Sequence, residues 1–170
     1  MTDHQHHVVL LTFEGGEGCH PAFEEAEHLP GIRQCAVLER SADGLLEVRE
    51  GYTRGAGVAT VGSGVVGGLV GLLGGPLGML LGFAAGAALG NAAEEGRTTA
   101  DGAGLIVLSA RVPDGASLLV LDIRESSPEP ADRLAARFGA ATVERIVADE
   151  FAEQVRAAER RAEESSEDAG

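Results

Sequence analysis

Residues 57–93 read GVATVGSGVVGGLVGLLGGPLGMLLGFAAGAALGNAA, and this stretch decides how the chain is divided. It lies within 39 residues, between Arg54 and Glu94, that carry no charge and include 13 glycines. Four-residue spacing places small residues on one stripe of an α-helix and lets two helix backbones approach closely. The glycines that we expect to make such helix-packing contacts are Gly64, Gly68, Gly71, Gly74, Gly78, Gly82, Gly86 and Gly90.

The stretch predicts a glycine-zipper helical hairpin. The sequence Gly74-Gly75-Pro76 divides it into two arms, 57–73 and 76–93, and Pro76 suits the first turn of the second helix. Each glycine costs a helix in water about 1 kcal/mol relative to alanine. Close helix packing, lipid or oligomerisation must therefore stabilise the hairpin.

The flanking sequence predicts an α+β domain, because short apolar runs alternate with amphipathic segments and turn signals. Residues 105–112 fit either a helix or a strand. The order of the elements suggests a small ferredoxin-like sandwich. Strands are expected at 7–13, 32–40, 45–52, 117–123 and 142–147, helices at 21–28, 128–138 and 149–163, and turns at 42–44 and 112–115.

The chain is thereby divided into four parts. The expected parts are the first part of the α+β domain at 1–56, the helical hairpin at 57–93, the second part of the domain at 94–148, and a charged helix with a disordered tail at 149–170. The tail begins at Glu164, where the apolar stripe of Phe151, Val155, Ala158 and Ala162 has ended.

Three motifs, in this order, resemble those of one known family. They are the strand hairpin at Ala36–Tyr52, GLVGLLGGPLG at Gly68–Gly78 followed by GAALG at Gly86–Gly90, and VPDGASLLVL at Val112–Leu121. Over about residues 7–123 the chain resembles the bacterial domain-of-unknown-function 1269 family of uncharacterised membrane proteins. The resemblance implies a split ferredoxin-like core with a glycine-zipper hairpin and a helix at 105–111. It brings no catalytic residues, and the charged C-terminal helix and the His-rich start depart from the family.

The charge of the chain limits its partners. The formal net charge is −14, with 13 basic and 27 acidic residues. Binding of nucleic acid through phosphate neutralisation needs a basic face, which this composition does not supply. Adhesion to anionic lipid through a polybasic patch is disfavoured for the same reason.

The length of each hairpin arm is close to the thickness of a bilayer core, which is about 30 Å. An arm of 17 or 18 residues spans roughly 27 Å as an α-helix. A hairpin leaves both termini on one side, and the start of the chain shows no secretory signal. We therefore expect the inner membrane with both termini cytoplasmic, which the flanking Arg54 and Arg97 also favour. The alternative is a cytoplasmic oligomer.

Candidate chemistry is sparse. The spacing of the possible metal ligands matches no standard zinc pattern, and we expect the two cysteines to be small buried side chains. The loop at 14–18 lacks the order of a phosphate-binding motif and is expected to be a turn. The carboxylates of Asp43, Glu47 and Glu50 fit a solvated strand face. The possible metal ligands are His4, His6, His7, Cys19, His20, His28 and Cys35.

The sequence thus favours a non-enzymatic membrane-associated protein, with no cofactor, whose cytoplasmic α+β domain is anchored by the hairpin. Its expected partners are further copies of itself and the lipid bilayer, and not nucleic acid. One alternative is a soluble oligomeric ligand-binding or regulatory module with the hairpin buried between subunits. Another is a metal-handling protein that uses the N-terminal His and Cys residues.

Overall fold

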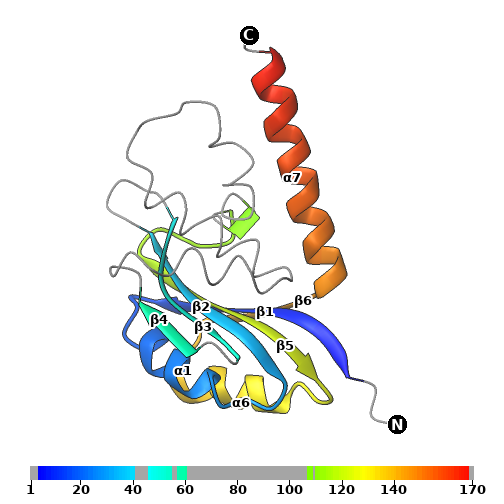
Figure 1. Cartoon of the computed structure of the whole chain (residues 1–170). Coiled ribbons are helices and arrows are strands. Elements are labelled where there is room, and N and C mark those ends of the chain that lie inside the picture. Colours follow the sequence, from blue (N-terminus) through cyan, green and yellow to red (C-terminus); the bar gives the residue numbers. More distant parts are fainter. Residues whose placement is uncertain (1–3, 41–45, 55–56, 61–106, 109, 169–170) are drawn as a thin grey trace.

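The computed structural model describes residues 4–40, 46–54, 57–60, 107–108 and 110–168, which form an α+β fold. The strands build one antiparallel sheet of six strands in the order β4-β3-β2-β5-β1-β6. Figure 1 shows α1 and α6 on one face of this sheet and α7 on the other. The elements are β1 (Gln5–Glu14), α1 (Cys19–Ala26), β2 (Ile32–Arg40), β3 (Leu46–Thr53), β4 (Gly57–Thr60), β5 (Ala116–Glu125), α6 (Glu129–Phe138), β6 (Thr142–Val147) and α7 (Ala148–Asp168).

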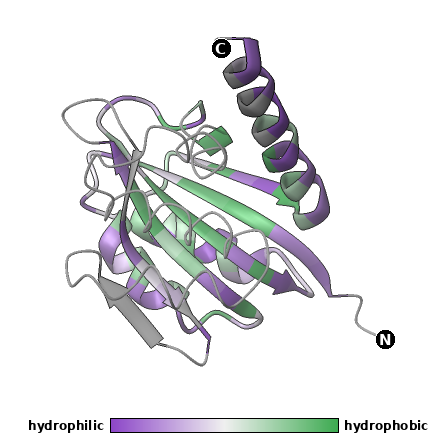
Figure 2. Ribbon diagram, turned by 45° about the horizontal axis from the view of Figure 1, so that its top comes forward, coloured by the Kyte–Doolittle hydropathy of each residue, from purple (hydrophilic) through white to green (hydrophobic). Residues whose placement is uncertain are grey.

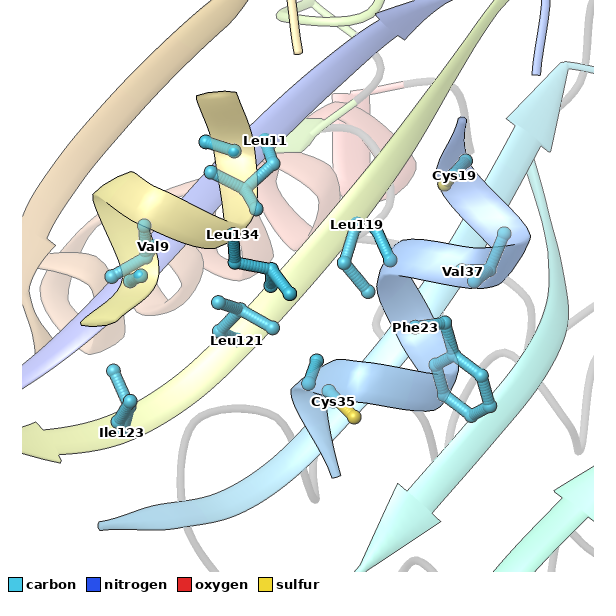
Figure 3. Close-up of a cluster of buried hydrophobic side chains, with 14 of the residues drawn as sticks. Val9, Leu11, Cys19, Phe23, Cys35, Val37, Leu119, Leu121, Ile123 and Leu134 are labelled. Atoms are coloured by element: carbon cyan, nitrogen blue, oxygen red, sulfur yellow. The ribbon is translucent and has the colours of Figure 1, made fainter. Parts of the chain in front are cut away.

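The face covered by α1 and α6 holds the larger of two hydrophobic clusters. Strand side chains alternate between faces, so every second residue of β1 and β5, and of β2 from Cys35 onward, points to these helices. Figure 3 shows these side chains meeting Cys19 and Phe23 of α1 and Leu134 of α6. The strand residues of the cluster are Val9, Leu11, Phe13, Ile32, Cys35, Val37, Leu119, Leu121 and Ile123.

The opposite face is buried too. The intervening residues of the same strands pack beneath Phe151 and Val155 of α7 and beside Leu108. Burial on both faces explains why β1 and β5 are nearly continuous apolar runs rather than alternating ones. The strand residues of this second cluster are Val8, Leu10, Ala36, Leu38, Ala116, Leu118, Val120 and Ile146.

All five predicted strands and the three helices predicted outside the hairpin are present, with small shifts at their ends. Strand β6 lies at the predicted residues, and α1 begins two residues before the predicted start. The predicted stop of α6 is confirmed, because Gly139 has a positive φ of 73° after the last turn. The turn before β5 is confirmed by Gly115, which has a φ of 76°.

Two predictions about boundaries are wrong. Residues 57–60 are not the start of a helical arm but strand β4, which pairs with β3 and so gains ladder hydrogen bonds that an isolated helix start lacks. Residues 164–168 are not a disordered tail, because α7 continues to Asp168. Within this last turn the Ser165 hydroxyl donates to the Arg161 carbonyl oxygen, at 2.8 Å, so the side chain is satisfied inside the helix.

Residues 61–106 lie outside the described residues. The remainder of the predicted hairpin falls there, with all of its packing glycines, and the turn predicted at 42–44 also lies outside the described part. Residues 107 and 108 are helical, as the family resemblance implies, but 110–111, which it also places in a helix, form a turn. Among the helices that the structure describes, none has the length and apolar character needed to cross a membrane.

Candidate functional site

Polar side chains gather at one end of the sheet, where β1 begins and β5 ends. The register pairs Gln5 of β1 with Glu125 of β5 and Val8 with Asp122, so these strand ends are neighbours. Figure 2 shows the first residues of β1 as hydrophilic and its middle as hydrophobic. The members of this polar cluster are His6, His7, Asp122, Glu125 and Arg145.

One half of the polar cluster is the pair of His6 and Asp122. The side chain of Asp122 is 1% exposed, and its Oδ1 is hydrogen-bonded to Nε2 of His6. An ionised carboxylate only accepts hydrogen bonds, so the His6 ring nitrogen donates. The other oxygen, Oδ2, is buried and has no hydrogen-bond partner among the described residues. The carboxylate of Asp122 therefore depends on His6, because burial without a partner is unfavourable.

The other half of the polar cluster centres on Glu125, which lies on the opposite side of the sheet end. Arg145 donates from Nε to Oε2 at 3.0 Å and from Nη2 to Oε1 at 3.3 Å, and His7 Nδ1 lies 3.2 Å from Oε2. Arg145 also reaches Asp132 Oδ1 at 2.8 Å and the Pro128 carbonyl at 3.0 Å. Partial burial acts to lower the pKa of Arg145, but the hydrogen bonds with Glu125 and Asp132 outweigh it and raise this pKa. The guanidinium therefore stays charged.

A cavity of about 270 Å³ lies beside Glu125. Its walls come from the end of β5, the loop before β2 and the first turn of α6. The carboxylate of Glu125 is engaged by Arg145 and His7, so it already has partners within the chain. These contacts connect four elements, β1, β5, β6 and α6, and we refer to the contacts of Arg145 with Glu125 and Asp132 as the buried joint. The lining residues are His4, Pro30, Gly31, Ile123, Arg124, Glu125, Ser126, Ser127 and Pro130.

Two more hollows lie on the helices. The first, of about 680 Å³, lies between α1 and α6 and is crossed at its rim by the ion pair of Arg137 and Glu25, at 2.7 Å. The second, of about 430 Å³, lies along α7 and includes Val107 and Arg160. Both are wide and rimmed by charged side chains, and the ion pair in the first neutralises part of its charge.

The residues that the sequence offers as possible metal ligands are spread over the fold. His6 and His7 bind the carboxylates of Asp122 and Glu125, while His20 Nδ1 lies 2.7 Å from Glu50 Oε2. His28 Nδ1 lies 3.1 Å from the backbone carbonyl oxygen of Glu24. Within the part of the chain that the structure describes, no three His, Cys, Asp or Glu residues group closely enough to hold a metal ion.

The two cysteines are buried and free, as predicted. Cys19 packs in the cluster under α1, and Cys35 lies in β2. Burial, together with nearby Glu39 and Glu50, raises the pKa of Cys19 to about 12. Burial likewise raises the pKa of Cys35. Neither thiol is activated, since the thiolate is the reactive form.

The remaining predicted features are the loop at 14–18 and three carboxylates. The loop at 14–18 is a turn, as predicted, with φ values of 76° at both Gly15 and Gly16. Of the three candidate carboxylates, Glu50 binds His20, while Asp43 and the side chain of Glu47 lie outside the described residues.

Sequence reasoning missed three members of the polar cluster, which are Asp122, Glu125 and Arg145. The signal was Asp122, a charge inside the otherwise apolar strand 117–123, where a buried carboxylate needs a partner. Arg145 is likewise a charged residue within the sequence of a strand, β6, whose side chain needs a partner. Their partners are set by tertiary structure, because His6 and Asp122 are 116 positions apart in the sequence.

Comparison with known proteins finds no matching family model, no matching curated protein and no matching solved structure. None of these comparisons therefore supports the resemblance to the domain-of-unknown-function 1269 family, which comes from the order of the three sequence motifs.

Proposed function

We propose that this chain is a non-enzymatic, membrane-associated protein whose α+β domain is anchored, and self-associates, through a glycine-zipper hairpin. The observation that carries the proposal is the run of 39 uncharged residues with 13 glycines between Arg54 and Glu94. Apolar helices that keep small residues at four-residue spacing pack closely in lipid, where Gly is frequent. The inner membrane, with both termini in the cytoplasm, is the proposed location.

The fold around this run supports a hairpin whose two ends stay on one side. Strand β4 takes up the first part of the run, at the edge of the sheet, and so holds the start of the run on the domain. After the run, Leu108 packs against the same sheet, in the cluster beneath α7. The chain thus leaves a folded domain and returns to it, as an inserted pair of antiparallel helices requires.

We also propose that the core of the domain is ferredoxin-like. Its two halves, β1-α1-β2 and β5-α6-β6, each consist of two strands and a helix. The inner strand order β2-β5-β1-β6 and the placement of both helices on one face support this assignment (Figure 1). Strands β3 and β4 extend the sheet beyond β2. The helical residues 107–108 support the proposed kinship with the domain-of-unknown-function 1269 family.

The proposed partners are further copies of this chain and the lipid bilayer. Nucleic acid is not among them, because the net charge is −14. On the described surface the arginines Arg133, Arg137 and Arg145 are paired with carboxylates, which also leaves them unsuited to phosphate.

Carbonate extraction of membranes from cells that express the full chain tests the proposed location. Retention in the membrane pellet is expected, because carbonate releases peripheral proteins and leaves inserted helices. Release into the supernatant would overturn membrane anchoring. A stable oligomer in that supernatant would support the alternative, a soluble module whose hairpin is buried between subunits.

The proposed packing of the hairpin is tested by Gly82→Leu, with Gly82→Ala as the matched control. Leucine at this position would separate two closely packed helices, whereas alanine is small enough to keep them together. Chemical cross-linking in isolated membranes should lose the oligomer in the leucine variant and keep it in the alanine variant. Equal cross-linking of both variants would contradict the glycine-zipper contact.

A further inference from the structure

Strand β6 has an open side. It is the last strand of the described sheet, with β1 on its inner side and no described strand on its outer side. An open edge of this kind presents backbone groups that can pair with another strand. Four of its six residues are β-branched, which favours an extended strand. They are Thr142, Val143, Ile146 and Val147.

The charges of β6 do not protect this edge. Edge strands usually discourage pairing with charged side chains that point into solvent. Here Glu144 is bound to Arg111, and Arg145 is bound to Glu125 and Asp132. Both charges are therefore neutralised within the chain before any other strand approaches.

The edge also presents two exposed apolar side chains. Val143 is 41% exposed and Val147 is 45% exposed, and within the described residues these are the large hydrophobic side chains that face solvent. Because strand side chains alternate, both lie on one face of the strand, with Arg145 between them. Val143 is opposite Leu11 of β1, so this is the face that α6 covers.

We infer that β6 pairs in antiparallel fashion with β6 of a second copy of this chain, about a two-fold axis at Arg145. In that register Val143 of each copy lies opposite Val147 of the other, which makes two apolar cross-strand pairs on the face that α6 covers. At the axis Arg145 lies opposite Arg145 of the second copy, and each guanidinium is already paired with Glu125 and Asp132 of its own copy. Directly opposed residues of a sheet must share a face, so a shift of one residue is excluded. Centring the axis on Glu144 or Ile146 would lose both valine pairs, because a valine would then lie opposite Arg145 on that face. The self-matching of the edge is what points to a second copy rather than to an unrelated strand.

This contact belongs to the α+β domain and is separate from the glycine-rich hairpin. It therefore goes beyond the proposed function, and it can hold whether or not the hairpin enters a membrane. It predicts a specific geometry between copies, which cysteine cross-linking can measure.

The test uses the full chain with Val143→Cys, Val147→Cys and the double variant. Opposed residues of an antiparallel pair have Cα atoms about 4.5–5.5 Å apart, within the range that a disulfide accepts. Two residues at position 143 in different copies would be roughly 13 Å apart along the strands, too far for a disulfide. The native Cys19 and Cys35 are buried, which keeps the background low. Ala136→Cys, at an exposed position on α6, is the control.

After oxidation with copper phenanthroline in air, non-reducing electrophoresis should show a disulfide dimer of the double variant. Its yield should exceed that of either single variant and of the Ala136→Cys control by at least about tenfold, because only the double variant places thiols opposite each other. Absence of the dimer in the double variant would overturn the proposal. So would equal yields from the single variants, because that pattern reports random collision or another register.

Discussion

Arg145 holds the buried carboxylate of Glu125 through two guanidinium nitrogens, Nε at 3.0 Å and Nη2 at 3.3 Å. The third nitrogen, Nη1, lies 2.8 Å from Asp132 at the start of α6. These contacts connect the edge strand β6 to β5, which lies on the far side of β1, and to helix α6. A buried charge that loses its partner costs more than the intact pair contributes, so each member of this joint depends on the other.

The two members should therefore behave as one energetic unit. We expect Glu125→Gln to lower the free energy of unfolding by about 2 kcal/mol, because it leaves the partly buried Arg145 short of a charge partner. In a double-mutant cycle with Arg145→Gln, the coupling free energy should be about 1–3 kcal/mol, as for other contacting residues. Urea unfolding of the purified full chain, followed by circular dichroism, measures both values.

The matched control is the exposed ion pair of Glu129 and Arg133, at 3.4 Å, on α6. The same two glutamine substitutions there should couple by about 0.5 kcal/mol or less, since both side chains are solvated. Equal coupling free energies in the two cycles would contradict a special role for the buried joint.

Gly31 is required at the approach of the loop before β2 to the end of β5. Its φ is +80°, and a Cβ atom there would lie 1.9 Å from the Arg124 carbonyl oxygen. Gly115 has a similar φ of +76° but open space around the same position. Gly31→Ala therefore adds a backbone clash to the strain of a positive φ, whereas Gly115→Ala adds only the strain.

We expect Gly115→Ala to destabilise the fold by about 1 kcal/mol and Gly31→Ala by about 3 kcal/mol or more, from strain and clash combined. Thermal unfolding of the two variants beside the parent chain gives the comparison. Similar losses in both would mean that the loop at Gly31 moves away from β5 at little cost.

Much of the domain could be predicted because its signals are local. The strand at 117–123 is a mostly apolar run after a Pro-Asp-Gly turn, and α6 is flanked by Pro128 before its first residue and Gly139 after its last. Both elements depend on residues within a few positions of each other. The buried state of Cys19 and Cys35 also followed from residue type alone.

The features that escaped prediction depend on distant residues. Strand β4 is embedded in a glycine-rich sequence, and its pairing with β3 is what makes it a strand. The end of α7 contains Ser165 and Ser166, which are weak helix formers, so no local signal extended the helix through them. Within the polar cluster, Asp122 can be recognised as a charge inside an apolar strand. Its partner His6 cannot be identified in the same way, because it lies near the other end of the sequence.

Helix α7 should be part of the domain rather than an appendage. Phe151 is fully buried and packs against the sheet, whereas its neighbour Glu150 is exposed. We expect Phe151→Ala to cost about 3–4 kcal/mol, from lost burial and the cavity left behind. Glu150→Ala should change stability by about 0.5 kcal/mol or less, as surface substitutions do. If urea unfolding gives the same midpoint for both variants, α7 does not contribute to the core.

The contact of His20 and Glu50 should make stability weakly dependent on pH. The hydrogen bond with Glu50 raises the pKa of His20 above its ordinary value of 6.5. A group whose pKa is higher in the folded state stabilises the fold fully below its unfolded pKa, and this stabilisation is lost as the pH rises through the folded pKa. Because His20 is 60% exposed, solvent screening keeps the effect to about 0.5 kcal/mol or less.

Glu50→Gln should therefore lower stability at pH 5.5 and leave it nearly unchanged at pH 8.5. Glu24→Gln is the control, because the Glu24 carboxylate is 3.8 Å from His20 Nε2 and 68% exposed, so its pH-dependent loss should be smaller. Urea unfolding midpoints of the parent chain and both variants at the two pH values measure the difference. A loss at pH 8.5 as large as that at pH 5.5 would show that Glu50 supports the fold through contacts other than the charge on His20.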